Sequence, residues 1–217
     1  MANENANAVP PEPKDASTVI LVRDAESGIE IFLLQRVQGD GVCRGGMTVF
    51  PGGGVDKSDA TAEVEWAGPS VEWWAERFST DVARAKALVL AAVRETFEEC
   101  GVLLAGPPTA DTVVADTAGY AQDRVALEKH ELSFSDFLKK ENLVLRTDLL
   151  RPWANWITPV GETRRYDTRF FVAASPTGQI ADGVTSEAAE VRWQSRRTRS
   201  RIGGRVAASC CRRRGVS

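Results

Sequence analysis

Three glutamates stand close together near the middle of the chain, in the segment A-A-V-R-E-T-F-E-E-C-G-V at residues 91–102. An α-helix turns about 100° per residue. Glu95, Glu98 and Glu99 would therefore share one face of such a helix, because their spacing is i, i+3, i+4. The apolar side chains of the opposite side are Val89, Val93, Phe97 and Cys100. The segment predicts a helix with one core face, in which Cys100 is packing, and one carboxylate face.

A carboxylate face of this kind suits a hard divalent cation. Three like charges repel one another, and near the C-terminus of a helix they also oppose the helix dipole. Mg²⁺ or Mn²⁺ would relieve both effects, since these ions prefer carboxylate oxygens. A solvated acidic face is the alternative, and the spacing alone leaves the two interpretations open.

The helix that carries the glutamates has predictable ends. Thr80 or Asp81 can serve as its N-cap, and Gly101 is a natural stop after Cys100. Some distance before this helix the chain reads F-P-G-G-G at residues 50–54. Such a glycine cluster indicates unusual backbone angles, or a close approach of the backbone to another group.

The remaining pattern predicts strands before and after this helix. A hairpin is expected from residues 17–23 and 29–36, joined by the turn D-A-E-S-G. Further elements are expected as a short strand at 47–50, helices at 71–78, 115–130 and 133–140, and strands at 153–158, 165–174 and 190–193. Residues 1–15 are polar and rich in proline, which predicts a disordered arm. Strands, a helix and then more strands indicate an α/β or α+β sandwich over residues 16–195.

Composition narrows the class of protein. A chain of 217 residues, 43% of them hydrophobic, suits one domain with a proper core. The net charge of −3 gives no general attraction to nucleic acid. The chain has no C-x-x-C pair and a single histidine, His130, so a structural zinc site is not expected. His130 is interpreted as a histidine on a helix surface, without a role. Without a secretory signal or a long apolar run, the chain is expected to be cytoplasmic, with no membrane partner.

The residues around the glutamates resemble the Nudix signature, G-x5-E-x7-R-E-U-x-E-E-x-G-U, where U is a bulky aliphatic residue. The second half of the signature is matched by Arg94, Glu95, Glu98, Glu99, Gly101 and Val102. Gly53 matches the opening glycine, and Asp59 stands five intervening residues later, where the family has glutamate. Thr96 replaces an aliphatic residue.

The spacing departs from the signature more strongly than the residue types do. Arg94 lies 41 residues after Gly53 instead of 14, so an insertion of 27 residues splits the motif. Residues 57–79 are expected to form this insertion, with one short helix, and the position of Asp59 relative to the motif is left open. A split motif resembles the Nudix subgroup that includes the mammalian peroxisomal coenzyme A diphosphatase. The resemblance extends to I-F-L-L-Q-R, R-P-W-A-N-W-I-T-P-V, R-R-Y-D-T-R-F-F-V-A and E-A-A-E-V-R-W.

The resemblance implies a Nudix sandwich, with a mixed β-sheet between helices and a helical insertion inside the motif. It also implies that Glu95, Glu98 and Glu99 bind Mg²⁺ or Mn²⁺, with the backbone carbonyl near Gly52 as a further ligand. Arg94 would orient the glutamates through charge-assisted pairs. The cation would neutralise a diphosphate and activate a water for in-line attack on phosphorus. Glu98, Glu99 and Arg94 are thus the expected catalytic residues.

Another carboxylate is expected in a loop before the last strand, where several Nudix enzymes place a metal-binding or base residue. Glu187, in S-E-A-A-E-V-R-W, is the candidate there, with an exposed loop glutamate as the alternative. Asp167 and Glu162 are weaker candidates for the same role.

Basic and aromatic residues outside the motif supply further candidates. The planar guanidinium groups of Arg36, Arg165 and Arg169 suit contacts with phosphates, although surface salt bridges are the more common role. Trp153 and Trp156 could stack on an adenine, but tryptophan beside strands more often packs in a core.

The composition changes abruptly after Trp193, where residues 196–217 become rich in arginine and lose any apolar periodicity. One interpretation is a basic arm for nucleic acid or acidic lipid. The other, which is favoured, is a shift of reading frame. Codons chosen for residues 196–217 and read two bases out of phase can give P-D-A-L-A-D-W-R-A-G-R-C-V-L-L-P-P-T-W-S-Q, which looks like the usual continuation of the subgroup.

These observations lead to an expected function. The chain is expected to hydrolyse a diphosphate bond in coenzyme A or acyl-CoA, with a small nucleotide as its partner. A Nudix hydrolase for a dinucleotide, ADP-ribose or a capped RNA end is the alternative within the enzyme class. A non-catalytic Nudix domain that binds nucleotides is the alternative outside it.

Overall fold

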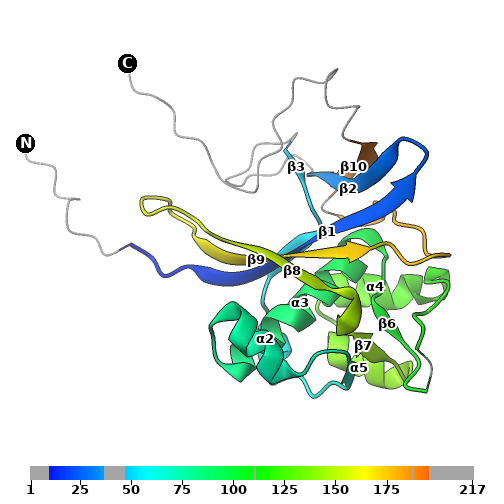
Figure 1. Cartoon of the computed structure of the whole chain (residues 1–217), viewed down its shortest axis with the longest axis horizontal. Coiled ribbons are helices and arrows are strands. Elements are labelled where there is room, and N and C mark those ends of the chain that lie inside the picture. The colour runs from blue at the N-terminus through cyan, green and yellow to red at the C-terminus, as the bar shows by residue number, and fades with distance from the viewer. Residues whose placement is uncertain (1–9, 37–46, 110, 187, 196–217) are drawn as a thin grey trace, which may run out of the picture.

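A seven-stranded mixed sheet forms the centre of the computed structural model, which describes residues 10–36, 47–109, 111–186 and 188–195 (Figure 1). Its strands are β1 (Lys14–Ala25), β2 (Gly28–Arg36), β3 (Thr48–Val49), β4 (Gly52–Gly54), β8 (Arg151–Ile157), β9 (Tyr166–Ala174) and β10 (Ala188–Ser195). The strand order is β10-β2-β1-β9-β8, while β3 pairs with β2 and β4 pairs with β1. The central pair β1 and β9 is parallel, and the other pairs are antiparallel.

The β1–β2 hairpin has the expected turn. Ala25 pairs with Gly28 at its end, and Gly28 has a φ of 101°, a left-handed value that glycine adopts without steric cost. Along β1, Ser17, Val19 and Leu21 are fully buried, so every second side chain faces the core as the period of a strand requires. The strand begins at Lys14, inside the segment expected to be a disordered arm, because its first residues pair with β9.

Helix α3 (Val82–Cys100) packs against this sheet with its ends where the sequence predicts them. The Asp81 carboxylate accepts a hydrogen bond of 2.9 Å from the Arg84 N–H, so Asp81 and not Thr80 is the N-cap. At the other end Gly101 has a φ of 72° and donates its N–H to the Phe97 carbonyl. The predicted core face of α3 is confirmed, since all four of its apolar residues are fully buried.

Smaller elements surround α3. They are α1 (Lys57–Thr61), α2 (Val71–Phe78), α4 (Ala121–Glu128), α5 (Phe134–Lys140) and a second sheet of order β5-β7-β6, made of β5 (Trp66–Ala67), β7 (Val144–Arg146) and β6 (Ala105–Gly106). The described residues also include two 3₁₀ turns, at Ala118–Tyr120 and Thr147–Leu149. The α/β sandwich class is confirmed, but Figure 1 shows the labelled helices gathered on one side of the large sheet, where the resemblance implied a sheet between helices. No helix in the described part of the chain has both the length and the hydropathy to cross a bilayer.

Two predictions for the helical regions are wrong in detail. The insertion at 57–79 contains two helices and a short strand instead of a single helix, because Asp56 caps an extra helical turn. The helix expected at 115–130 starts only at Ala121, after a 3₁₀ turn. The Arg-rich residues 196–217 lie outside the described residues.

Candidate active site

The carboxylate face of α3 is buried. Glu98 and Glu99 have only 8% and 5% of their surface exposed, although both carry acidic side chains. A solvated acidic face, the alternative left open by the sequence, is therefore wrong. Burial of ionisable groups is costly unless something compensates for the charge, so the surroundings of each carboxylate decide what the site can do.

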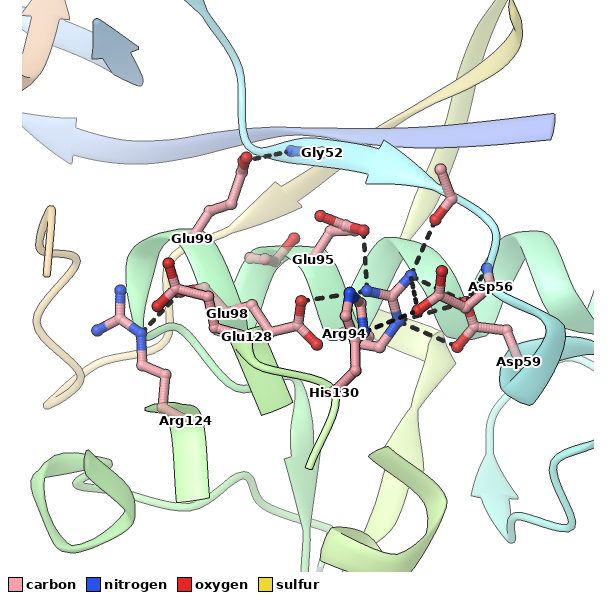
Figure 2. Close-up of polar contacts among 12 residues, drawn as sticks. Gly52, Asp56, Asp59, Arg94, Glu95, Glu98, Glu99, Arg124, Glu128 and His130 are labelled. Atoms are coloured by element: carbon pink, nitrogen blue, oxygen red, sulfur yellow. Dashed lines mark hydrogen bonds and ion pairs between the residues drawn. The ribbon is translucent and has the colours of Figure 1, made fainter. Parts of the chain in front are cut away.

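Arg94 is the main compensating group, and it lies at the centre of the cluster (Figure 2). Its guanidinium donates to Glu95 at 2.8 Å, to Glu98 at 3.1 Å and to the backbone oxygen of Gly54 at 2.9 Å. It also makes a forked contact with Asp59, with 2.9 Å for the shortest bond. The predicted pairing of Arg94 with the glutamates is thus present, and it leaves the side chain only 4% exposed.

Asp59 comes from the other half of the split motif, 35 residues before Arg94. It lies in α1, where its carboxylate also accepts the N–H of Asp56, and it is 1% exposed. Burial raises the pKa of Asp59 in spite of the opposing effect of the Arg94 guanidinium. The insertion therefore leaves the motif intact in space, because α1 folds back onto α3 before the rest of the insertion begins.

The glycine cluster approaches α3 from the sheet. The Gly52 N–H donates to the Glu99 carboxylate at 2.7 Å. A Cβ at Gly52 would collide with the carbonyl oxygen of Ser17, and one at Gly53 would stand 2.6 Å from the Glu95 carboxylate. Gly52 is thus required for close packing on the backbone of β1, whereas a side chain at Gly53 would displace the Glu95 carboxylate. This confirms the prediction that the backbone approaches another group here.

The cluster has more acids than bases. Burial raises the pKa of Glu95 and of Glu98 to about 7, and the Arg94 charge only partly opposes this effect. Both carboxyls are therefore partly protonated at neutral pH. The guanidinium of Arg36, at the end of β2, lies 3.7 Å from the Glu99 carboxylate and adds a second positive charge at the edge.

These residues fit a hard divalent cation by donor type and by charge. Carboxylate oxygens are the preferred ligands of Mg²⁺ and Mn²⁺, and such an ion would replace the protons that Glu95 and Glu98 hold near neutral pH. Within the described residues no three histidine, cysteine, aspartate or glutamate side chains converge on one point. The glutamates point instead towards Arg94 and Gly52, as Figure 2 shows.

Other candidates make contacts elsewhere. Arg165 donates to the carbonyls of Thr158 and Pro11. Arg169 donates to the Phe78 carbonyl at 3.3 Å. Of the three arginines considered for phosphate contacts, only Arg36 therefore has a described contact with the carboxylate cluster.

The alternative carboxylates differ in their surroundings. Asp167 is buried and pairs with Arg84 at 2.9 Å and with the Asn155 amide, which occupies both of its oxygens. Glu162 lies half-buried between β8 and β9. Glu187 lies outside the described residues, between Ser186 and the first residue of β10.

The tryptophans of β8 are not core residues. Trp153 is 71% exposed and Trp156 is 47% exposed, because β8 is the edge strand of the sheet. Trp74 of α2 is fully buried instead. Cys100 packs in the core as predicted, and burial raises the pKa of its thiol to about 12.

Several residues near the site were not predicted. His130, expected to be without a role, lies with its Nδ1 3.5 Å from an Asp56 carboxylate oxygen, next to the Arg94 cluster. Arg124 and Glu128 of α4 approach the C-terminal end of α3 (Figure 2). No local pattern in the sequence marks these three residues, because their position depends on how α4 docks.

The sandwich and the reassembled motif define a Nudix hydrolase, and the chain belongs to that family. Residues 72–202, more than half of the chain, match the NUDT19 Nudix domain. Among solved structures, a Nudix hydrolase from Alicyclobacillus acidocaldarius shares the fold with a TM-score of 0.65 at 24% identity, covering 87% of this chain and 81% of that one.

Two relatives have named activities. The acyl-coenzyme A diphosphatase NUDT19 of Xenopus laevis is 23% identical over 201 residues, which is 77% of this chain and 53% of that protein. The protein of the same name from Gallus gallus is 30% identical over 189 residues, which is 68% of this chain and 49% of that protein. The chain thus spans about half the length of these relatives.

Proposed function

We propose that this chain hydrolyses the diphosphate bond of coenzyme A or acyl-CoA with the help of Mg²⁺ or Mn²⁺. The observation that carries the hydrolase part is the acid-rich cluster around Arg94, in which the carboxyls outnumber the two guanidinium groups. The names of the Xenopus laevis and Gallus gallus relatives support the choice of substrate.

Glu95, Glu98 and Glu99 would hold the cation, with the backbone carbonyl of Gly52 as a further donor. When bound, such an ion neutralises the diphosphate and lowers the pKa of a coordinated water. Arg94 contributes by fixing the orientation of Glu95 and Glu98 through its charge-assisted hydrogen bonds.

The chain's own residues can also move a proton. The pKa of about 7 for Glu95 and Glu98 applies without a cation, and a bound cation would lower it. A carboxylate of the cluster that does not hold the cation could therefore accept the proton of an attacking water. The partly exposed guanidinium of Arg36, beside Glu99, suits a contact with a substrate phosphate.

Product analysis tests the proposal. The purified chain is incubated with Mg²⁺ or Mn²⁺ and with coenzyme A, acetyl-CoA, ADP-ribose, NADH or a dinucleotide, and products are identified by mass. We expect a 3′,5′-ADP product and a phosphopantetheine from coenzyme A, and an acetylated phosphopantetheine from acetyl-CoA. The matched control is Glu98→Gln, which keeps the size of the side chain and removes its charge.

The other outcomes separate the alternatives. Cleavage of ADP-ribose or a dinucleotide without cleavage of coenzyme A would overturn the substrate assignment. Release of free acetate alone would show attack on the thioester. Binding of nucleotides without any product would support a non-catalytic domain.

A further inference from the structure

Helix α4 lies across the C-terminal end of α3, where Glu98 and Glu99 stand. The Arg124 side chain is only 9% exposed, and its Nε donates to the backbone oxygen of Glu98 at 2.9 Å. The last four carbonyls of a helix lack hydrogen-bond donors within the helix. Arg124 supplies a donor to one of these carbonyls, that of Glu98. A guanidinium at this end also interacts favourably with the helix dipole.

The same guanidinium reaches the loop between β9 and β10. Its Nη1 donates to the Asp182 carboxylate at 2.7 Å. The backbone N–H of Asp182 in turn donates to the Cys100 carbonyl at 3.0 Å. Arg124 and Asp182 together therefore join the last turn of α3 to this loop.

Glu128 makes a second connection to the loop, one helical turn after Arg124. Its carboxylate accepts the Ser186 N–H at 2.7 Å and the hydroxyls of Ser186 and Thr185. Positions i and i+4 share a helix face, so one face of α4 contacts both the turn that carries the glutamates and the end of the loop. The helix itself is held in the core by Leu127, which is 2% exposed.

We propose that Arg124 and Glu128 are positioning residues of the active site. They act as a clamp that holds the Glu98–Glu99 turn and the loop at residues 182–186 in a fixed relation. This inference rests on the proposed hydrolase function. In that function, α4 sets the geometry of the carboxylates from outside the motif, through Arg124 on α3 and Glu128 on the loop.

The test compares Glu128→Ala, Glu128→Gln and Arg124→Lys with Asp123→Ala in the full chain. Asp123 is the matched control, because it is an acid on the same helix that pairs with Lys140 of α5 at 2.7 Å and not with the loop. The first readout is amide hydrogen exchange of residues 179–186 without metal. The others are Mn²⁺ affinity by calorimetry and the kcat and KM for coenzyme A.

We expect Glu128→Ala to speed exchange at Thr185 and Ser186, which would loosen the loop that Asp182 joins to Arg124 and to the Cys100 carbonyl. Through this indirect link kcat or Mn²⁺ affinity should fall by up to about 10- to 100-fold, the range for residues that support metal ligands. KM should change little. Glu128→Gln should lose less activity than Glu128→Ala, since its amide oxygen still accepts hydrogen bonds. Arg124→Lys should still fold but should lose the hydrogen bonds that join Glu98 to Asp182. Asp123→Ala should match the unchanged chain.

Equal exchange and equal kcat in Glu128→Ala and Asp123→Ala would overturn the clamp. This result is distinct from failure of the proposed function. If the unchanged chain does not cleave coenzyme A, the exchange and Mn²⁺ measurements still decide whether Glu128 and Arg124 hold the loop. If it does cleave coenzyme A and the Glu128 variants cleave it equally well, only the clamp is wrong.

Discussion

Replacing Arg94 by methionine removes the positive charge at the centre of the carboxylate cluster. Methionine fills much of the arginine stem volume, so the main loss is electrostatic. The change leaves Asp59, Glu95 and Glu98 without the guanidinium that contacts all three. It also leaves the Gly54 carbonyl without its donor.

The expected loss of stability follows from burial. Removing one partner of a buried ion pair costs about 3–5 kcal/mol, and both Arg94 and Asp59 are almost fully buried. Arg84→Met is the matched control on the same helix, because Arg84 also contacts two acids, Asp15 and Asp167, but is 35% exposed. Because Arg84 is more exposed than Arg94, we expect a smaller loss than for Arg94→Met, although its partner Asp167 is buried.

The loss should depend on pH in a defined direction. The pKa of Glu95 and Glu98 is about 7 with Arg94 present, and it should rise further without that charge. A carboxyl with a raised pKa in the folded state binds extra protons on folding. It therefore does not destabilise the fold below its ordinary pKa of 4.5, and it destabilises the fold increasingly as the pH rises through its folded pKa. We therefore expect Arg94→Met to lower the free energy of unfolding by about 2 kcal/mol or less at pH 5.5. At pH 8 the loss should reach the full value of about 3–5 kcal/mol.

The assay is urea denaturation at pH 5.5 and pH 8 in the presence of a chelator. The double variant Arg94→Met, Asp59→Asn should recover part of the loss, because it removes one of the unpaired charges. A loss of under about 1 kcal/mol at pH 8, or an equal loss at both pH values, would refute the electrostatic reasoning.

Three other predictions concern catalysis, metal binding and packing. Glu98→Gln or Glu99→Gln should lower turnover by at least about 10²- to 10⁴-fold with an unchanged circular dichroism spectrum, and near-normal rates in both would contradict the assigned site. Mg²⁺ or Mn²⁺ should raise the melting temperature more at pH 8 than at pH 5.5, because Glu95 and Glu98 must lose their protons to bind the ion. Calorimetric scans with equal shifts at the two pH values would argue against binding there. Gln179→Leu should cost about 1–3 kcal/mol in urea denaturation, since the buried Gln179 amide bonds both the N–H and the carbonyl of Leu103, and a neutral result would show that these groups find other partners.

The sequence alone determined the features that depend on neighbouring residues. The limits of α3 follow from Asp81 and Gly101, whose side-chain cap and left-handed φ act on adjacent turns. The shared face of Glu98 and Glu99 follows from helical periodicity. The turn at Gly28 is local in the same way, and all of these were predicted.

The tertiary structure decided everything that joins distant segments. The pairing of Asp59 with Arg94 spans 35 residues and could not be placed from the split motif. The strands β5, β6 and β7 have two or three residues each, too few for a periodic pattern, and they form because they pair with one another. The sequence could not decide whether Trp153 and Trp156 pack in the core or stay exposed, because the edge position of β8 is set by strand order.

Burial had the largest effect on the site. A sequence shows that Glu98 and Glu99 share a helix face, but it does not show whether water reaches that face. Docking of the sheet, α1 and α4 around α3 removes the water, and this desolvation raises the pKa of Glu98 to about 7. Local spacing thus selected the residues of the site, whereas long-range packing set their charge, because the free energy of an ionised group depends on everything assembled around it.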